Sequence, residues 1–306
     1  MSAGRTAAGG SLLLGTLWAM AAACGWTAMA TTVRYLEGRV PSWDLSFYRA
    51  LTVILIGIGP MLWQGGGHVM SLLPRRELFW SYLFRGCLIF GGQACYYYAL
   101  MHMKLADATV LNATAPIFSA LFAIFMLGER VTAQRWLLIV VGFAGVVVII
   151  QPGFQTLTLE AGFALASAVL FAVSAILNKQ MVKRASGASI VYGTNFFVAG
   201  CGLGVVLIWG VKPTWADLSI VALIGACGAA AQYCLSRALV HADVSYLSPF
   251  EFTRVPMAAI VAWFLFAEPT PVIFVVGALL IFISVLLLAR HAVRANPAPA
   301  ASDAVT

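Results

Sequence analysis

The chain contains ten apolar runs, each about long enough to cross a lipid bilayer as a helix. A helix rises about 1.5 Å per residue, so roughly 20 residues span the hydrocarbon core. Hydrophobic residues make up 62% of the chain and charged residues only 9%, which excludes a soluble domain of this length. The sequence therefore predicts an all-α, polytopic membrane protein with ten transmembrane helices. The runs cover residues 12–33, 45–63, 79–102, 105–127, 134–151, 161–179, 188–210, 217–239, 243–267 and 271–289.

Lysine and arginine are distributed unequally between the two sides that these spans define. Eleven fall on the side of both termini, four on the opposite side, and Arg49, Arg85 and Arg254 inside spans. Because basic residues are enriched in cytoplasmic loops, we expect both termini in the cytoplasm and the spans in the inner cell membrane. Topology thus explains the net charge of +7, and no basic run indicates a nucleic-acid partner. Residues 295–306, rich in Ala and Pro, are expected to form a disordered cytoplasmic tail.

Two parts of the sequence resemble each other in order and spacing. Each half then holds five spans, an odd number, so the second half would enter the membrane from the opposite side. We therefore predict two inverted repeats, over residues 10–151 and 160–290. Inverted repeats recur in secondary transporters, where the substrate site lies near the midplane between the halves. At an offset of 136 residues the matching pairs are Gly92 and Gly228, Tyr97 and Tyr233, Ala106 and Ala242, Asp107 and Asp243, and Leu111 and Leu247.

The ninth run carries two charged residues, Glu251 and Arg254, between Pro249 and Pro256. Their i, i+3 spacing places both side chains on one helix face. Charges in the bilayer core cost several kcal/mol, so they usually face a partner or a cavity. One interpretation is an ion pair that fastens helices together. The other, favoured by the repeat, is a pair that lines a solute path where the prolines loosen the helix.

Polar residues on the third and eighth runs extend this candidate site. Gln93 and Tyr97 share a helix face at i, i+4 spacing, and so do Gln232 and Ser236, with Tyr233 beside them. Tyrosine and glutamine side chains offer hydrogen bonds along an otherwise apolar wall, as in small-molecule sites. The alternatives are hydrogen bonding between helices for the glutamines and anchoring at the membrane interface for the tyrosines.

On the fourth run, Asn112 shares a stripe with Thr109 and Pro116. We expect the inward-facing polar and charged residues to bind substrate, and the prolines and Arg49 to act in gating or in structure. The substrate-binding candidates are Gln93, Tyr97, Asn112, Gln232, Tyr233, Glu251 and Arg254, and the gating or structural candidates are Arg49, Pro116, Pro249 and Pro256.

Motifs for ATP-driven or hydrolytic chemistry are absent from the sequence. It contains no GxxxxGK[ST], HExxH or GxSxG motif, and the spacing of its six cysteines indicates neither a zinc site nor a disulfide framework, so no metal or cofactor is expected. An intramembrane enzyme with Glu251 as base and Asp107 or Asp243 as partner is the alternative from another class, but helix capping accounts for both aspartates. Protons are the candidate coupling ion, carried by Glu251, although Arg254 beside it would hold that carboxylate charged. Oligomeric state leaves no signal in the sequence.

The sequence resembles the paired EamA domains of the drug/metabolite transporter superfamily over roughly residues 10–290. This resemblance implies ten helices in an inverted-repeat basket, with a central cavity lined mainly by the third, fourth, eighth and ninth spans. It also implies transport of small metabolites, often amino acids or related compounds. The resemblance rests on Phe47-Tyr48-Arg49, Ala115-Pro116, Leu127-Gly128-Glu129-Arg130, Gly142, Gly145, and Pro249-Phe250-Glu251-Phe252-Thr253-Arg254 leading to Glu268.

The expected function is secondary transport of a small organic metabolite, an amino acid or related compound, by alternating access. The alternative is an uptake permease for a larger, nucleoside- or vitamin-like compound. In both cases the expected partners are the substrate and the lipid bilayer, and the chain is not expected to be an enzyme.

Overall fold

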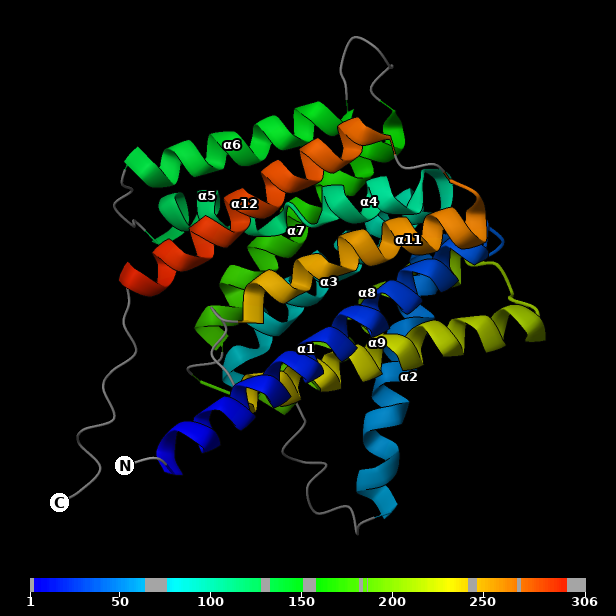
Figure 1. The fold of residues 1–306 in the computed structure, drawn as a ribbon. Helices are drawn as coiled ribbons and strands as arrows, with labels where there is room; N and C mark the ends of the chain where they lie inside the picture. Colours follow the sequence, from blue (N-terminus) through cyan, green and yellow to red (C-terminus); the bar gives the residue numbers. More distant parts are fainter. Residues whose placement is uncertain are drawn as a thin grey trace, which may run out of the picture.

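A computed structural model describes residues 3–63, 76–127, 133–150, 158–181, 184–185, 187–241, 247–268 and 271–295. Helices occupy nearly all of these segments and no strand occurs in them, so the all-α fold class is confirmed (Figure 1). The predicted tail lies outside the described residues, apart from Ala295. The helices are α1 (Ala3–Tyr35), α2 (Ser42–Trp63), η2 (Arg76–Leu78), α3 (Phe79–His102), α4 (Leu105–Asn112), α5 (Ala115–Leu127), α6 (Ala133–Ile150), α7 (Leu159–Met181), α8 (Gly187–Trp209), α9 (Trp215–His241), η3 (Ser248–Thr253), α11 (Arg254–Phe266) and α12 (Val272–Ala295).

Several of these helices have the length and composition of membrane spans. Four stretches within α1, α7, α8 and α9 are long and apolar enough to cross a bilayer unaided. Shorter apolar helices occur within α6, α11 and α12. The first helix begins and the last helix ends at the same end of the bundle (Figure 1). The protein is therefore built as a membrane protein, while the crossing of all ten runs stays a prediction.

The fourth apolar run is divided into α4 and α5, although the sequence predicts one helix there. Pro116 is the second residue of α5 and lacks the N–H that would otherwise bond to the Asn112 carbonyl. The Thr114 hydroxyl donates to the Leu111 carbonyl at 2.6 Å and closes the turn between the two helices. Interrupted helices at membrane depth are tolerated where they line a cavity or are buried in protein.

The described part of the ninth run also changes helix type. The 3-10 helix η3 ends at Thr253, and α11 begins at Arg254. Pro249 lies in the first turn of η3 and Pro256 is the third residue of α11. In a first turn the missing N–H of proline costs little, because the first backbone donors of a helix have no partner within it. Arg254 thus stands at the start of a helix.

The main packing contacts join helices of the first half of the chain to helices of the second half. α1 lies along α9, α3 along α7, α2 along α8, and α6 along α12 (Figure 1). In addition, α5 contacts α7, and both η3 and α11 contact α1. The largest buried cluster includes Val33, Leu36, Leu100, Leu105 and Ala258, where α1, α3, α4 and α11 meet. The two halves are therefore interleaved.

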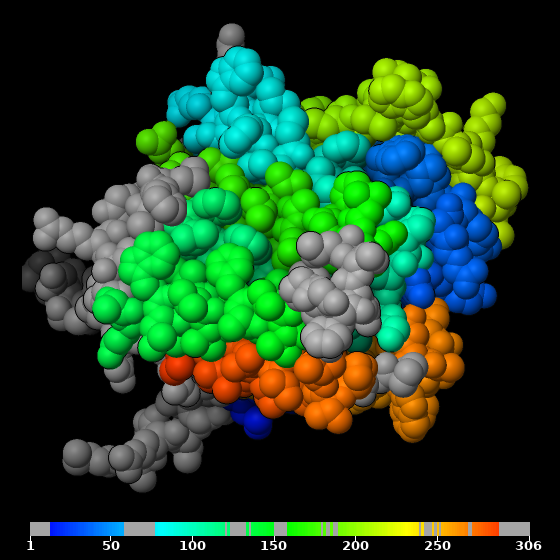
Figure 2. Space-filling view, turned by 90° about the horizontal axis from the view of Figure 1, so that it is seen from above, coloured from blue at the N-terminus to red at the C-terminus, as the bar shows by residue number. Residues whose placement is uncertain are grey.

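Small residues let α6 and α12 lie side by side, as the adjacent green and orange surfaces in Figure 2 show. A Cβ atom on Gly145 would lie 2.8 Å from the Gly277 carbonyl oxygen and 2.8 Å from Ile281 Cγ1. The Ser284 hydroxyl donates to the Leu138 carbonyl at 2.6 Å and adds a polar contact to this interface. Close approach through small residues is the usual basis of helix association in membranes.

One ion pair ties several segments together at the end of α1. Arg34 Nη2 lies 2.9 Å from Glu268 Oε1, and Arg34 Nη1 donates to the Met101 carbonyl at 2.7 Å. The other oxygen of Glu268 accepts the Leu105 backbone N–H at 3.1 Å. Glu268 reaches this position because Ala267 ends α11 in a left-handed conformation, with φ 51°. This network fastens α1, α3, α4 and α11 at one end of the bundle.

The glycine contact between α6 and α12 yields a prediction. Gly145→Ala places a methyl group against the backbone of α12, so we expect it to destabilise the protein by about 1–3 kcal/mol. Gly200→Ala is the matched control, since a Cβ atom there meets nothing within 4 Å. The measurement is the thermal unfolding midpoint in detergent. Equal midpoints for both variants would contradict the close packing of α6 on α12.

Candidate functional site

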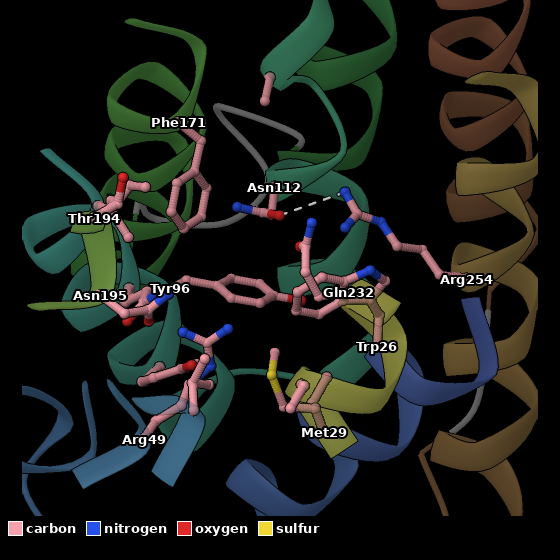
Figure 3. A pocket seen from close by; sticks show the side chains of 18 of the residues that line it. Trp26, Met29, Arg49, Tyr96, Asn112, Phe171, Thr194, Asn195, Gln232 and Arg254 are labelled. Carbon is pink, nitrogen blue, oxygen red and sulfur yellow. Dashed lines mark hydrogen bonds between the residues drawn. The ribbon is translucent and has the colours of Figure 1, made fainter. Parts of the chain in front are cut away.

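A cavity of about 320 Å³ lies inside the bundle (Figure 3). Residues of α1, α2, α3, α4, α5, α7, α8, α9 and α11 line it. The third, fourth, eighth and ninth runs contribute to this wall, as the family resemblance implies, and the first, second, sixth and seventh runs also contribute. Its volume lies at the lower end of the range of small-molecule sites, about 300–1,000 Å³.

Six of the residues selected from the sequence line this cavity. They come from five different helices, so their side chains meet only because the two halves of the chain interleave. These residues are Arg49 of α2, Gln93 and Tyr97 of α3, Asn112 of α4, Gln232 of α9 and Arg254 of α11.

Asn112 connects α4 to both α7 and α11. Its Nδ2 donates to Ser167 Oγ at 2.9 Å, and the Ser167 hydroxyl donates to the Ala164 carbonyl at 2.6 Å. Asn112 Oδ1 accepts a hydrogen bond from Arg254 Nη2 at 3.5 Å, drawn as a dashed line in Figure 3. The asparagine is only 4% exposed. Its amide is therefore held in place by Ser167, and its long contact to the Arg254 guanidinium brings no negative charge to that group.

The Arg49 side chain extends from α2 into the cavity and lies against Gly228 of α9. A Cβ atom on Gly228 would lie 3.2 Å from Arg49 Nε and 3.2 Å from Met29 Sδ. Each distance is shorter than ordinary van der Waals contact, so a larger residue would have to displace one of its neighbours. Gly228 thus leaves room for the guanidinium of Arg49, a residue that is only 7% exposed.

Five buried polar atoms of the lining residues have no hydrogen-bond partner in the described part of the protein. They are the Nε atoms of Arg49, Arg85 and Arg254, the Oε1 of Gln93 and the hydroxyl of Tyr97. Leaving a buried polar group unsatisfied costs about 1–3 kcal/mol. Their concentration around one cavity indicates that water or a ligand occupies it.

Positive charge dominates the cavity wall. Arg49, Arg85 and Arg254 contribute to it, and none of its described lining residues is acidic. Arg85 donates a hydrogen bond to the hydroxyl of Thr194 on α8. Arg85 was not among the site residues selected from the sequence. The signal for it was present, since Arg85 interrupts an apolar run as Arg254 does.

Tyr233, which the repeat predicted to bind substrate as Tyr97 does, is not among the residues that line this cavity. Its side chain is 60% exposed and lies edge-on to Trp18, with ring centroids 6.1 Å apart. Successive residues of a helix point about 100° apart, so Gln232 faces the cavity and Tyr233 faces away. On α3, Tyr96 joins Tyr97 in the cavity wall, and both side chains are buried.

The remaining sequence candidates fall outside this cavity or outside the described part of the chain. Nothing is described of the side chains of Glu251 and Pro249, so their predicted roles stay predictions. Pro116 is not among the lining residues, although Ala115 beside it is. Pro256 lines a separate apolar groove of about 780 Å³ between α11 and α12.

Comparison with characterised relatives shows what the chain is similar to. The S-adenosylmethionine uptake transporter of Rickettsia prowazekii is 26% identical over 77% of this chain and 78% of its own. The riboflavin transporter of Rhizobium johnstonii is 27% identical over 94% of this chain and 95% of its own. The pseudopaline exporter of Pseudomonas aeruginosa is 28% identical over 90% of this chain and 96% of its own. These relatives are transporters of small molecules.

A solved crystal structure superposes on 91% of this chain and 98% of its own, with a TM-score of 0.62. At 20% identity this likeness concerns the fold alone. Residues 13–151 and residues 158–290 each match the EamA-like transporter family. Together the two matches cover most of the sequence. The chain belongs to the EamA-like transporter family.

Proposed function

We propose that the protein is a secondary transporter that carries a small organic metabolite through the central cavity by alternating access. The observation that carries this proposal is the group of five unpaired polar atoms around the cavity. Both matched segments supply lining residues, for example Gln93 from the first and Gln232 from the second. A binding site between two halves suits a mechanism in which the halves rock about the substrate.

The packing of the helices supports an arrangement of ten spans in two inverted repeats, over residues 10–151 and 160–290. We count α4 with α5 as the fourth span and η3 with α11 as the ninth. When the halves are exchanged, spans one to five take the places of spans six to ten. The contact between spans one and eight then corresponds to the contact between spans six and three. The contact between spans four and six corresponds in the same way to the contact between spans nine and one. The contacts of two with seven and five with ten convert into themselves. Halves related by two-fold symmetry give this pattern.

The names of the relatives bear on the substrate. Two of them are named for S-adenosylmethionine and riboflavin, and these names favour a nucleoside- or vitamin-like compound. No relative described above is named for an amino acid. The names include both uptake and export, so direction is a separate question. We propose Gln93, Tyr97, Asn112, Gln232 and Arg254 as substrate-binding residues, with Arg49 and Arg85 as further contacts.

Transport by the purified protein in liposomes is the direct test of this proposal. The compounds are S-adenosylmethionine, riboflavin, nucleosides, neutral and acidic amino acids, and linear dicarboxylates, each with and without an imposed pH gradient. We expect saturable uptake or efflux of at least one compound above that of protein-free liposomes. A response to the pH gradient would support protons as the coupling ion. Absence of saturable flux for every compound would contradict the proposed function.

The variant Tyr97→Phe tests whether the Tyr97 hydroxyl binds substrate or only stabilises the fold. The substitution removes only the unpaired hydroxyl, so we expect about tenfold weaker substrate binding with an unchanged unfolding midpoint. Tyr233→Phe is the matched control, because this tyrosine lies outside the cavity on the second half. The measurement is the KM for transport in liposomes. A normal KM for Tyr97→Phe, or equal losses in both variants, would contradict the assignment.

The proposed orientation places both termini in the cytoplasm of a cell with an inner membrane. It rests on the excess of Lys and Arg on the side of the termini, eleven against four. A reporter that is active only outside the cytoplasm should be silent when fused after Arg294. The same reporter inserted at Pro213, between α8 and α9, should be active. The reverse pattern of activity would overturn the orientation.

A further inference from the structure

We propose that the transported compound carries two negative charges, one at each end, and that Arg254 binds one of them and Arg49 the other. This inference rests on the proposed function, because it names the class of substrate for the same cavity. It follows from the charge of the cavity wall, from the unpaired donors there, and from the positions of the two arginines.

No acidic residue among the described ones balances the charge of the wall. The ion pairs of the described residues are Arg34 with Glu268 and Arg39 with Asp217, and none of these four residues lines the cavity. Among the described residues, the three cavity arginines have neutral partners or none. Even if Glu251 were to pair with Arg254, two positive charges would remain. A buried charge without a partner is strongly unfavourable, so the cavity favours an anionic ligand over a neutral one.

We call the Arg254 side and the Arg49 side of the cavity its two poles. At each pole the arginine has a donor nitrogen without a partner among the described residues, and an uncharged residue of another helix lies beside it. At one pole, Arg254 Nη2 donates a 3.5 Å hydrogen bond to Asn112 Oδ1, and Arg254 Nε has no partner among the described residues. At the other, Arg49 Nε is likewise unpaired, and the space above Gly228 admits its guanidinium. A guanidinium presents its donors as a planar fork, which matches a carboxylate or phosphate group.

Figure 3 shows Arg49 and Arg254 on opposite sides of the cavity, with the ring of Tyr96 and the side chain of Gln232 between them. Trp26 and Phe171 also face this middle region. Aromatic side chains provide apolar surface, and the Gln232 amide both donates and accepts hydrogen bonds. The site therefore suits an elongated compound with an apolar or planar body between two anionic ends.

The test measures ligand-induced stabilisation of the purified protein in detergent at constant ionic strength. The ligands are linear dicarboxylates of increasing chain length, the matched monocarboxylates, and the matched diamides. We expect dicarboxylates to raise the unfolding midpoint most, with an optimum chain length that bridges the two arginines. Stabilisation that is equal for dicarboxylates and diamides, or for dicarboxylates and monocarboxylates, would overturn the proposal.

Variants of the two poles test the roles of the individual arginines. We expect Arg49→Gln and Arg254→Gln each to weaken dicarboxylate binding about 10- to 100-fold and to abolish the preference over monocarboxylates. Arg237→Gln is the matched control, since Arg237 lies over the Trp18 ring outside the cavity. Normal binding in either pole variant would overturn the assignment.

The liposome assay distinguishes failure of this inference from failure of the proposed function. Saturable transport restricted to neutral or cationic compounds would refute the dianionic substrate and leave the transporter intact. Selective dicarboxylate binding without transport of any compound that binds would refute the transporter and leave the anion site intact.

Discussion

The convergence of three arginines with buried Nε atoms inside an apolar helical bundle is the constraint on which the cavity depends. Guanidinium groups stay charged, and a charge without solvent or a partner is unfavourable inside a protein. Arg49, Arg85 and Arg254 converge on one space, and none of them has an acidic partner among the described residues. Gly228 leaves room for one of them, and Asn112 contacts another. The polar interior and the packing around it therefore follow from the same three residues.

The interrupted helices are the second part of this arrangement. Pro116 ends the possibility of one continuous helix on the fourth run, and the ninth run changes from η3 to α11 at Arg254. Both interruptions bring residues at helix ends, Asn112 and Arg254, to the cavity wall. At the end of α1, by contrast, Arg34 and Glu268 pair directly and fasten the bundle. The charged groups at this end thus form an ion pair, whereas the arginines of the cavity have no acidic partner among the described residues.

The sequence predicts the helices well, because long apolar runs leave few other structures possible in a membrane. It also predicts Arg254, since an arginine in an apolar run requires a polar environment. The same argument applies to Arg85, which was not among the site residues selected from the sequence. An arginine in an apolar run therefore shows a need for polar surroundings, but not which of several such arginines belong to one site. Tyr233 shows a different limit. Correspondence within a repeat aligns two positions but does not fix the rotation of each helix, and α9 turns this tyrosine outward.

The central claim is that the cavity between the two halves is the transport site. A structure of the protein determined with a transported compound tests it most directly. We expect the compound to lie between Arg49 and Arg254, in contact with the Tyr97 hydroxyl, and to pair with the polar atoms that have no partner among the described residues. A compound bound instead in the apolar groove of α11 and α12, with the arginine cavity unchanged, would contradict the account.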